Sequence, residues 1–167
     1  MLYVGIDPGL DGAVAAIDHR ADFIGVWDAP TIEVKRGKGK KRNYVEAEMA
    51  AILRRLYTHG GPAAVLLAVE NVHAMPKQGV TSMFSMGFGL GLWLGAVAGL
   101  QLPYERVEPR TWKAGMGLAT GSDKGASVML ASRLFPEAPL TRKKDHGRAE
   151  ALLMAAWLRR KHECPIR

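Results

Sequence analysis

Two apolar runs that each end in a carboxylate constrain this 167-residue chain most strongly. Residues 2–6 are apolar and lead into Asp7, and residues 63–69 form an unbroken apolar run that leads into Glu70. Runs of this length and composition predict buried strands. Asp7 also opens an Asp-Pro-Gly turn sequence, so turn formation alone explains it equally well. Glu70 has no such turn role, and a carboxylate at the end of a buried strand requires a cation or a hydrogen-bond partner.

The remaining pattern predicts an α/β fold in a single domain, with a mixed five-stranded sheet flanked by helices. The expected strands cover residues 2–6, 13–17, 23–27, 63–69 and 102–107, and the expected helices cover residues 45–57, 80–98, 122–135 and 145–161. We expect the domain to cover residues 1–162 and a short tail to follow at 163–167. Functional groups in such sheets lie outside the carboxyl ends of the central strands, where Asp7 and Glu70 stand.

A basic charge balance points to a polyanionic partner. Lys and Arg outnumber Asp and Glu by 23 to 16, which gives a formal net charge of +7. Charge alone does not separate DNA from RNA or from an anionic membrane. Two basic clusters stand out, namely Lys38, Lys40, Lys41 and Arg42, and then Arg142, Lys143 and Lys144. Each is either a solvated surface or a set of phosphate contacts, and we favour the second reading if the chain also carries a site that cleaves phosphodiesters. We expect residues 33–42 to form a loop, either a solvated connection or a DNA contact that orders on binding.

The uncharged stretch at residues 78–104 is long enough to span a bilayer. It carries six glycines and several polar residues, which favours a buried helix packed through small residues over a membrane span. Gly87, Gly91 and Gly95 recur on one helical face, and this face allows packing on the sheet or on a second subunit equally. The single cysteine, Cys164, excludes an intrachain disulfide and a zinc cluster, and a reducing cytoplasmic compartment is expected.

Two carboxylates on neighbouring strand ends favour hard divalent cations such as Mg²⁺. Two such ions, about 3.5–4 Å apart, activate water and stabilise the leaving oxygen in phosphodiester hydrolysis. The start of the last helix offers Asp145, His146 and Glu150 as further ligands. We rank Glu150 first, then Asp145, which alternatively caps the helix, and then His146, which alternatively acts on the water or the phosphate.

Four features carry a resemblance to a known family. They are GIDPG at 5–9, VEN at 69–71, the Gly-rich long helix, and DHGRAEALLMAA at 145–156. In this order and spacing they resemble the RuvC family of Holliday junction resolvases, in particular its phage-type members, over residues 2–158. The resemblance implies an RNase H-like fold, a homodimer and symmetric nicking of four-way DNA junctions, leaving 5′-phosphate and 3′-hydroxyl ends. It also implies catalysis by two Mg²⁺ ions with Mn²⁺ as a substitute, in a bacterial or phage-infected cell.

By position, Asp7 and Glu70 match the family's first two metal ligands, and Lys113 and Lys124 match basic residues that approach the scissile DNA. The chain departs from the bacterial pattern in two places. Bacterial members carry two ligands three residues apart on the last helix, where this chain has Gly147 and Glu150, so Asp145 or His146 is left to complete the site. His73 stands where those members have an aromatic wedge, and imidazole stacks on bases only weakly.

Three other functions compete with that of a junction-resolving nuclease. An actin-like or sugar-kinase ATPase needs two domains around its nucleotide, and this chain has room for one. A non-catalytic junction-binding protein does not need Asp7, Glu70 and Glu150 together. A different RNase H-like nuclease, acting on flaps or RNA–DNA hybrids, remains compatible with the sequence.

Overall fold

The computed structural model describes residues 1–37, 39–58, 61–73, 79–119 and 124–163, with the backbone alone for Arg36, Pro62 and Lys124. Lys38, the first two residues of the helix expected at 122–135, and Cys164 therefore lie outside the described residues.

The predicted mixed five-stranded sheet is confirmed. Its strands are β1 (Leu2–Asp7), β2 (Ala13–Asp18), β3 (Phe23–Asp28), β6 (Val65–Glu70) and β7 (Tyr104–Val107), in the order β3-β2-β1-β6-β7. The first three strands pair antiparallel, whereas β1 with β6 and β6 with β7 pair parallel. Because Ile6 pairs with Val69, the chain leaves β1 at Asp7 and β6 at Glu70 on the same edge of the sheet.

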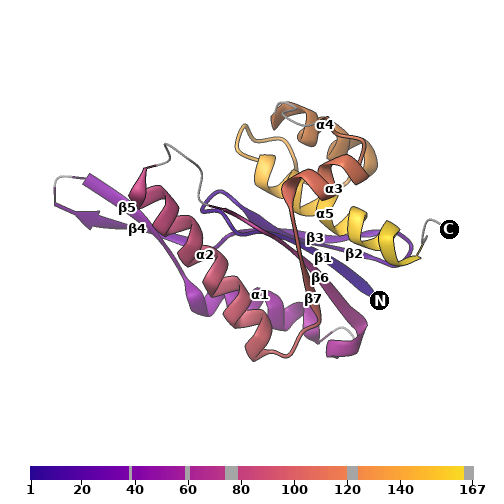
Figure 1. Cartoon of the computed structure of the whole chain (residues 1–167), viewed down its shortest axis with the longest axis horizontal. Helices are drawn as coiled ribbons and strands as arrows, with labels where there is room; N and C mark the ends of the chain where they lie inside the picture. Colours follow the sequence, from indigo (N-terminus) through magenta and orange to yellow (C-terminus); the bar gives the residue numbers. More distant parts are fainter. Residues whose placement is uncertain (38, 59–60, 74–78, 120–123, 164–167) are drawn as a thin grey trace.

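Helices cover both faces of the sheet (Figure 1). One face carries α1 (Glu46–Tyr57) and α2 (Val80–Gly99); a short 3₁₀ turn (Pro62–Ala64) leads into β6. The other face carries α3 (Pro109–Gly115), α4 (Lys124–Leu134) and α5 (His146–Glu163). The α5 helix packs directly on β1, since a Cβ at Gly5 would overlap the carbonyl oxygen of Ala151.

The expectation of a loop at residues 33–42 is wrong. This segment belongs to a two-stranded antiparallel hairpin of β4 (Thr31–Arg36) and β5 (Gly39–Tyr44), which extends from the body of the molecule (Figure 1). The two strands satisfy each other's backbone groups, and Gly37 adopts a positive φ of 60° at the turn. Both faces of this hairpin are largely exposed to solvent, so its strands need no apolar face. Many of its side chains are basic, and apolar periodicity therefore does not predict these strands.

The expectation that α2 is buried is correct for one face only. Gly89, Leu90, Trp93 and Val97 are buried, but only 22% of the helix's most apolar 18-residue window is buried. By length and composition α2 could cross a membrane. The face bearing Gly87, Gly91 and Gly95 is open, and a Cβ at any of the three would meet nothing within 4 Å. These glycines therefore do not serve packing on the sheet.

Candidate active site

Asp7 and Glu70 lie at the ends of the neighbouring strands β1 and β6. The backbone N–H of Gly9 donates to Asp7 Oδ1 at 3.1 Å, and a Cβ at Gly12 would overlap the Asp7 carbonyl oxygen, so the following loop turns tightly around this carboxylate. Glu70 is only 8% exposed, and it accepts a hydrogen bond of 2.9 Å from the Trp112 indole N–H. The two strands thus hold both carboxylates in a confined position that is largely shielded from solvent.

This confinement changes the acidity of both groups. Burial raises the pKa of Asp7 to about 6, Glu150 adds to the rise, and the Gly9 N–H and Lys113 oppose it. Burial, followed by the charge of Asp7, raises the pKa of Glu70 to about 7, against the opposing effects of the Trp112 hydrogen bond and Lys113. The charge of Glu150 makes both Asp7 and Glu70 harder to ionise, and the charge of Asp7 has the same effect on Glu70, which means that the site is short of positive charge.

Lys113 and Glu150 complete the group from two different helices. Lys113 Nζ on α3 lies 2.7 Å from Glu150 Oε1 on α5, and it also lies 5.1 Å from the centre of the Trp112 ring. Asp7 and Glu70 both feel the charges of Glu150 and Lys113. One ammonium group therefore stands among three carboxylates. Among the described residues, no three His, Cys, Asp or Glu side chains are grouped closely enough to hold a metal ion as they stand.

Gly147 brings the start of α5 to the loop that follows β1. A Cβ at Gly147 would overlap the carbonyl oxygen of Asp11 and crowd Gly12, so no side chain fits at this position. The close approach explains why the chain carries glycine where an acidic or imidazole ligand was expected from the family pattern. It also places His146 and Glu150 on the wall of the same hollow as Asp7.

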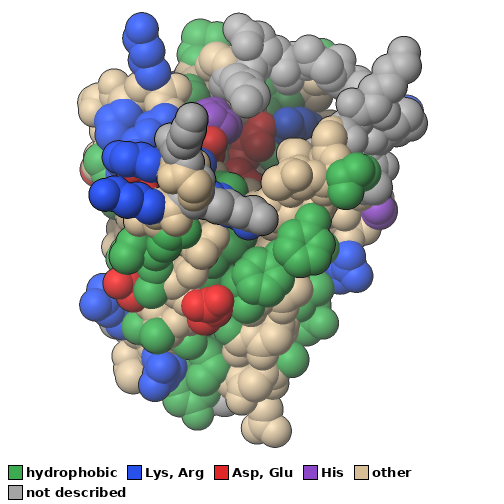
Figure 2. Space-filling view, turned by 90° about the vertical axis from the view of Figure 1, so that its left-hand side faces the viewer, with side chains coloured by type: hydrophobic (Ala, Val, Ile, Leu, Met, Phe, Trp, Pro, Cys, Tyr) green, Lys and Arg blue, Asp and Glu red, His purple; other side chains and the backbone are tan. Residues whose placement is uncertain are grey.

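That hollow has a volume of about 880 Å³. Figure 2 shows acidic side chains in its depth, with a histidine and several Lys and Arg side chains around them. The hairpin contributes Lys40, Lys41 and Arg42 to the wall, and α2 contributes hydroxyl groups. An acidic floor beneath a basic rim suits a ligand with negative charge that is bound through a cation.

Asp145 is not brought into this group. It is completely buried, and it accepts hydrogen bonds from the backbone N–H of Arg142 at 2.6 Å and from Arg142 Nε at 2.7 Å. Arg148 lies 3.7 Å from it, and both arginines also bind Asp28 at the end of β3. Arg142 and Arg148 hold the pKa of the Asp28 carboxyl well below its usual range. The structure thus gives Asp145 partners that tie the segment before α5 to the sheet.

The other predicted DNA contacts are spread around the site. Lys40 Nζ lies 2.9 Å from Glu33, Arg42 lies 2.8 Å from Asp11, and Lys143 and Lys144 are exposed. The side chain of Lys124, like Lys38, lies outside the described residues.

His73 stands just beyond β6, and it is exposed. Its Nε2 lies 2.9 Å from Glu108 and 3.2 Å from Asn71 Nδ2, and Arg106 also donates to Asn71. Asn71 donates to Glu108 in turn, and this hydrogen bond, followed by that from His73, lowers the pKa of Glu108. The imidazole is therefore engaged with polar partners beside the active site.

Two aromatic residues of the site were not identified from the sequence. Trp112 is completely buried, as a core residue would be, but its indole N–H also donates to Glu70. Tyr44 donates from its hydroxyl group to the Pro8 carbonyl at 3.0 Å, and so fixes the loop that follows Asp7 against the hairpin. Burial raises the pKa of Tyr44 to about 12, so it stays a donor. The one sequence signal for Trp112 was its place directly before Lys113.

No protein-family model matches the chain. A curated relative, "Holliday junction resolvase MOC1, chloroplastic" of Chlamydomonas reinhardtii, is 33% identical over 148 residues. The match covers 79% of this chain but only 17% of that protein, so the chain spans a small part of its relative.

Two solved structures share the fold. The Thermus thermophilus RuvC structure superposes with a TM-score of 0.58 and 16% identity, covering 98% of this chain and 96% of that chain. T. thermophilus RuvC in complex with a Holliday junction substrate superposes with a TM-score of 0.57 and 16% identity, covering 97% of both chains. The chain thus shares the fold of RuvC and is similar in sequence to a Holliday junction resolvase, in agreement with the resemblance that the four sequence motifs carry.

Proposed function

We propose that the chain is a metal-dependent endonuclease that cleaves branched DNA, in particular four-way (Holliday) junctions. The observation that carries this proposal is the group of Asp7, Glu70, Glu150 and Lys113 beneath a basic rim. The names of the relative and of the T. thermophilus structures support the choice of substrate. Cleavage would leave 5′-phosphate and 3′-hydroxyl ends.

The donor set fits a hard divalent cation. Asp7, Glu70 and Glu150 offer carboxylate oxygens, which Mg²⁺ prefers. The pKa values of Asp7 and Glu70 are raised, in part by the charge of Glu150, and a bound cation would offset this repulsion. Two Mg²⁺ ions, or Mn²⁺ in their place, would supply water activation and charge neutralisation at the scissile phosphate. When Glu150 serves as a ligand, Lys113 is released from its ion pair and its ammonium group can bind a phosphate oxygen.

Among the residues that were ranked from the sequence, we assign the third ligand role to Glu150. His146 lines the same hollow as Asp7 and Glu150, so it is in position to contact the scissile phosphate or the attacking water. Asp145 acts as a positioning residue, because its carboxylate oxygens already bind Arg142. Lys124 and His73 are kept as proposed DNA contacts on the strength of the family pattern alone.

The basic rim would hold the DNA backbone. Lys40, Lys41 and Arg42 on the hairpin line the hollow, and Lys143 and Lys144 before α5 are exposed cations. Each contact of this kind adds affinity through counterion release and carries no sequence information. We therefore propose that the hairpin is the principal backbone clamp, in a protein that works on DNA inside a bacterial or phage-infected cell.

A homodimer would place two active sites on the two symmetric strands of a junction. The open face of α2 is the candidate interface, since Val80, Phe84 and Phe88 are exposed apolar residues in line with the open glycines Gly91 and Gly95. The rings of Phe84 and Phe88 stack with centroids 6.1 Å apart. Exposed apolar stripes of this kind mark contact surfaces. A second copy of the chain that covers this stripe would shield its apolar side chains from water without a membrane.

The test is a cleavage assay with Mg²⁺ on four labelled substrates of matched sequence: a four-way junction, a flap, a duplex and an RNA–DNA hybrid. We expect paired nicks in the junction and little cleavage of the duplex. Preferred cleavage of the flap or of the hybrid would assign the same chemistry to a different RNase H-like nuclease. Binding of the junction without cleavage in Mg²⁺ or Mn²⁺ would contradict a nuclease altogether.

A further inference from the structure

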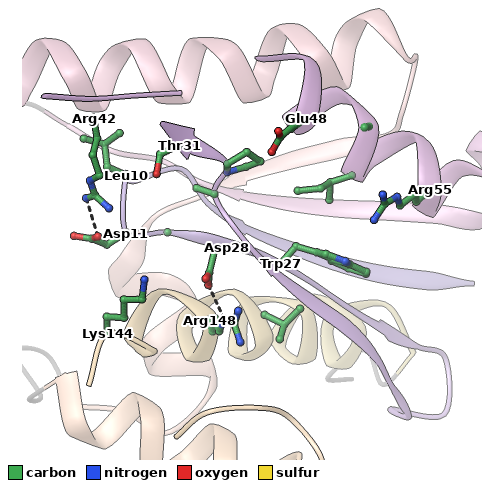
Figure 3. Close-up of a pocket in the computed structure, with 16 residues that line it drawn as sticks. Leu10, Asp11, Trp27, Asp28, Thr31, Arg42, Glu48, Arg55, Lys144 and Arg148 are labelled. Carbon is green, nitrogen blue, oxygen red and sulfur yellow. Dashed lines mark hydrogen bonds and ion pairs between the residues drawn. The ribbon is translucent and has the colours of Figure 1, made fainter. Parts of the chain in front are cut away.

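A second hollow, with a volume of about 740 Å³, lies beside the active-site hollow (Figure 3). Strand β3 forms its floor, one face of α1 forms one wall, and the start of α5 forms the other. Figure 3 shows Arg42 and Asp11 at one end and Arg55 at the other, with Trp27 extending toward Arg55. The proposed catalytic chemistry makes no use of this hollow.

The two hollows share a wall. Leu10, Asp11, Gly12 and Arg42 line both of them, and the ion pair between Arg42 and Asp11 spans 2.8 Å at this boundary. The side chains of Arg42 and Asp11 are 36% and 54% exposed, and exposed ion pairs contribute little to stability. A phosphate group can therefore take Arg42 from Asp11 at little cost, which leaves a continuous path from the catalytic carboxylates into the second hollow.

The lining combines cations with an aromatic surface. Lys144 stands at the active-site end, and no partner for its ammonium group is found in the described part of the chain. Arg148 is already held by Asp28 at 2.5 Å, so its charge is neutralised within the wall. The Trp27 ring is partly exposed and lies over β3, where a Cβ at Gly25 would come within 2.7 Å of it.

This combination matches the chemistry of a nucleotide. Bases stack favourably on aromatic side chains, whereas phosphates require cations. The volume lies within the range of roughly 300–1,000 Å³ that small-ligand sites occupy. Although β3 is an edge strand that a peptide could extend, the path into the active site favours a strand of the DNA itself.

We propose that the second hollow binds a nucleotide of the cleaved strand next to the scissile phosphate, with its base against Trp27 and its phosphates on Arg42 and Lys144. This inference rests on the proposed function, because the DNA strand must pass through the active-site hollow first. The site fixes the register of the strand at the catalytic carboxylates, and this makes it a determinant of where the strand is cut.

The first experiment places a negative charge inside the hollow. Ala51→Glu puts a carboxylate on the α1 wall, and Ala47→Glu makes the same change on an exposed part of the same helix outside the hollow. For cleavage of a four-way junction, we expect Ala51→Glu to raise KM on the order of tenfold with little change in kcat, since it repels the phosphates. Ala47→Glu should match the wild type, and equal KM values for the two variants would overturn the proposal.

The second experiment uses the wild-type protein, so it does not depend on the folding of a variant. Four-way junctions carrying 5-iododeoxyuridine at single positions flanking the cleavage site are irradiated on the protein with Ca²⁺ in place of Mg²⁺. We expect a crosslink from one flanking position to the peptide that contains Trp27. Crosslinks confined to peptides that do not line the hollow would overturn the proposal while leaving the nuclease intact. A wild-type protein that neither binds nor cleaves the junction would overturn the proposed function itself.

Discussion

Glu70 stands between two opposing influences. Burial and the charge of Asp7 raise its pKa to about 7, while the Trp112 indole lowers it by donating to the carboxylate. The ionised forms of Asp7 and Glu70 are the ones that bind a cation. Both groups lose their protons as the pH rises through about 6 to 7, so activity should increase with pH across this window.

Removal of the Trp112 hydrogen bond should move this window upward. In Trp112→Phe the ring still fills the core, but the carboxylate loses a donor that favours its ionised form. We expect the acidic limb of the kcat/KM profile to shift to higher pH, with activity at pH 6 reduced about tenfold and restored at alkaline pH. The control is Trp157→Phe, because Trp157 packs against Gly115 of the same helix α3. Profiles that coincide for wild type and Trp112→Phe would contradict this role.

Glu150 and Asp145 should differ in what their substitutions impair. Glu150→Gln removes the carboxylate that we propose as the third metal ligand, so we expect loss of cleavage in a protein that melts normally. Asp145→Asn weakens the buried contacts with Arg142, so we expect a loss of about 1–3 kcal/mol in stability with cleavage retained below the melting temperature. Cleavage assays and thermal melting separate the two. A stable but inactive Asp145→Asn protein would make Asp145 the ligand instead.

At the scale of elements, the start of α5 and the loop after β1 depend on contact through Gly147. Gly147→Ala improves helix propensity by about 1 kcal/mol, yet the new Cβ overlaps Asp11, and such overpacking costs about 1–3 kcal/mol. We expect a lower melting temperature together with a large loss of cleavage, because Glu150 and His146 move away from Asp7. Gly99→Ala, in open space at the end of α2, is the matched control. Normal activity in Gly147→Ala would show that this contact does not position the site.

The elements that sequence predicted best are those with apolar periodicity. Strands β1 and β6 are apolar up to their last residue, so their ends, and with them Asp7 and Glu70, could be located. The hairpin was missed because its strands pair only with each other and carry charged side chains. Helix α3 has only seven residues, too few for a helical pattern, and Pro109 at its start was the only marker. The apolar composition of α2 did not reveal that much of its surface is uncovered.

The candidate site was predictable only where its residues lie at the end of an apolar strand. A strand end locates Asp7 or Glu70 from a few neighbouring residues, whereas the Trp112 bond to Glu70 joins residues 42 positions apart. The choice between Asp145 and Glu150 depended on where the last helix begins. Because α5 begins at His146, Asp145 precedes the helix, and arguments from helical angles do not apply to it.

At the scale of the whole molecule, the apolar stripe on α2 should hold two copies together. Phe84→Glu places a charge in the centre of the proposed interface, so we expect sedimentation to shift from dimer to monomer and paired nicks to become single nicks. Met129→Glu makes a similar change at an exposed apolar residue on α4 and should leave the dimer intact. A wild-type protein that sediments as a monomer while it makes paired nicks would contradict the dimer.

The most direct measurement compares wild type, Asp7→Asn and Glu70→Gln in single-turnover cleavage of a labelled four-way junction with Mg²⁺, alongside binding of the same junction. Both substitutions keep the size of the side chain and remove the charge that would bind the metal. We predict that cleavage falls by on the order of a thousandfold or more in each variant while junction binding persists. Cleavage at the wild-type rate in either variant would contradict the assignment of these two strand ends as the catalytic centre.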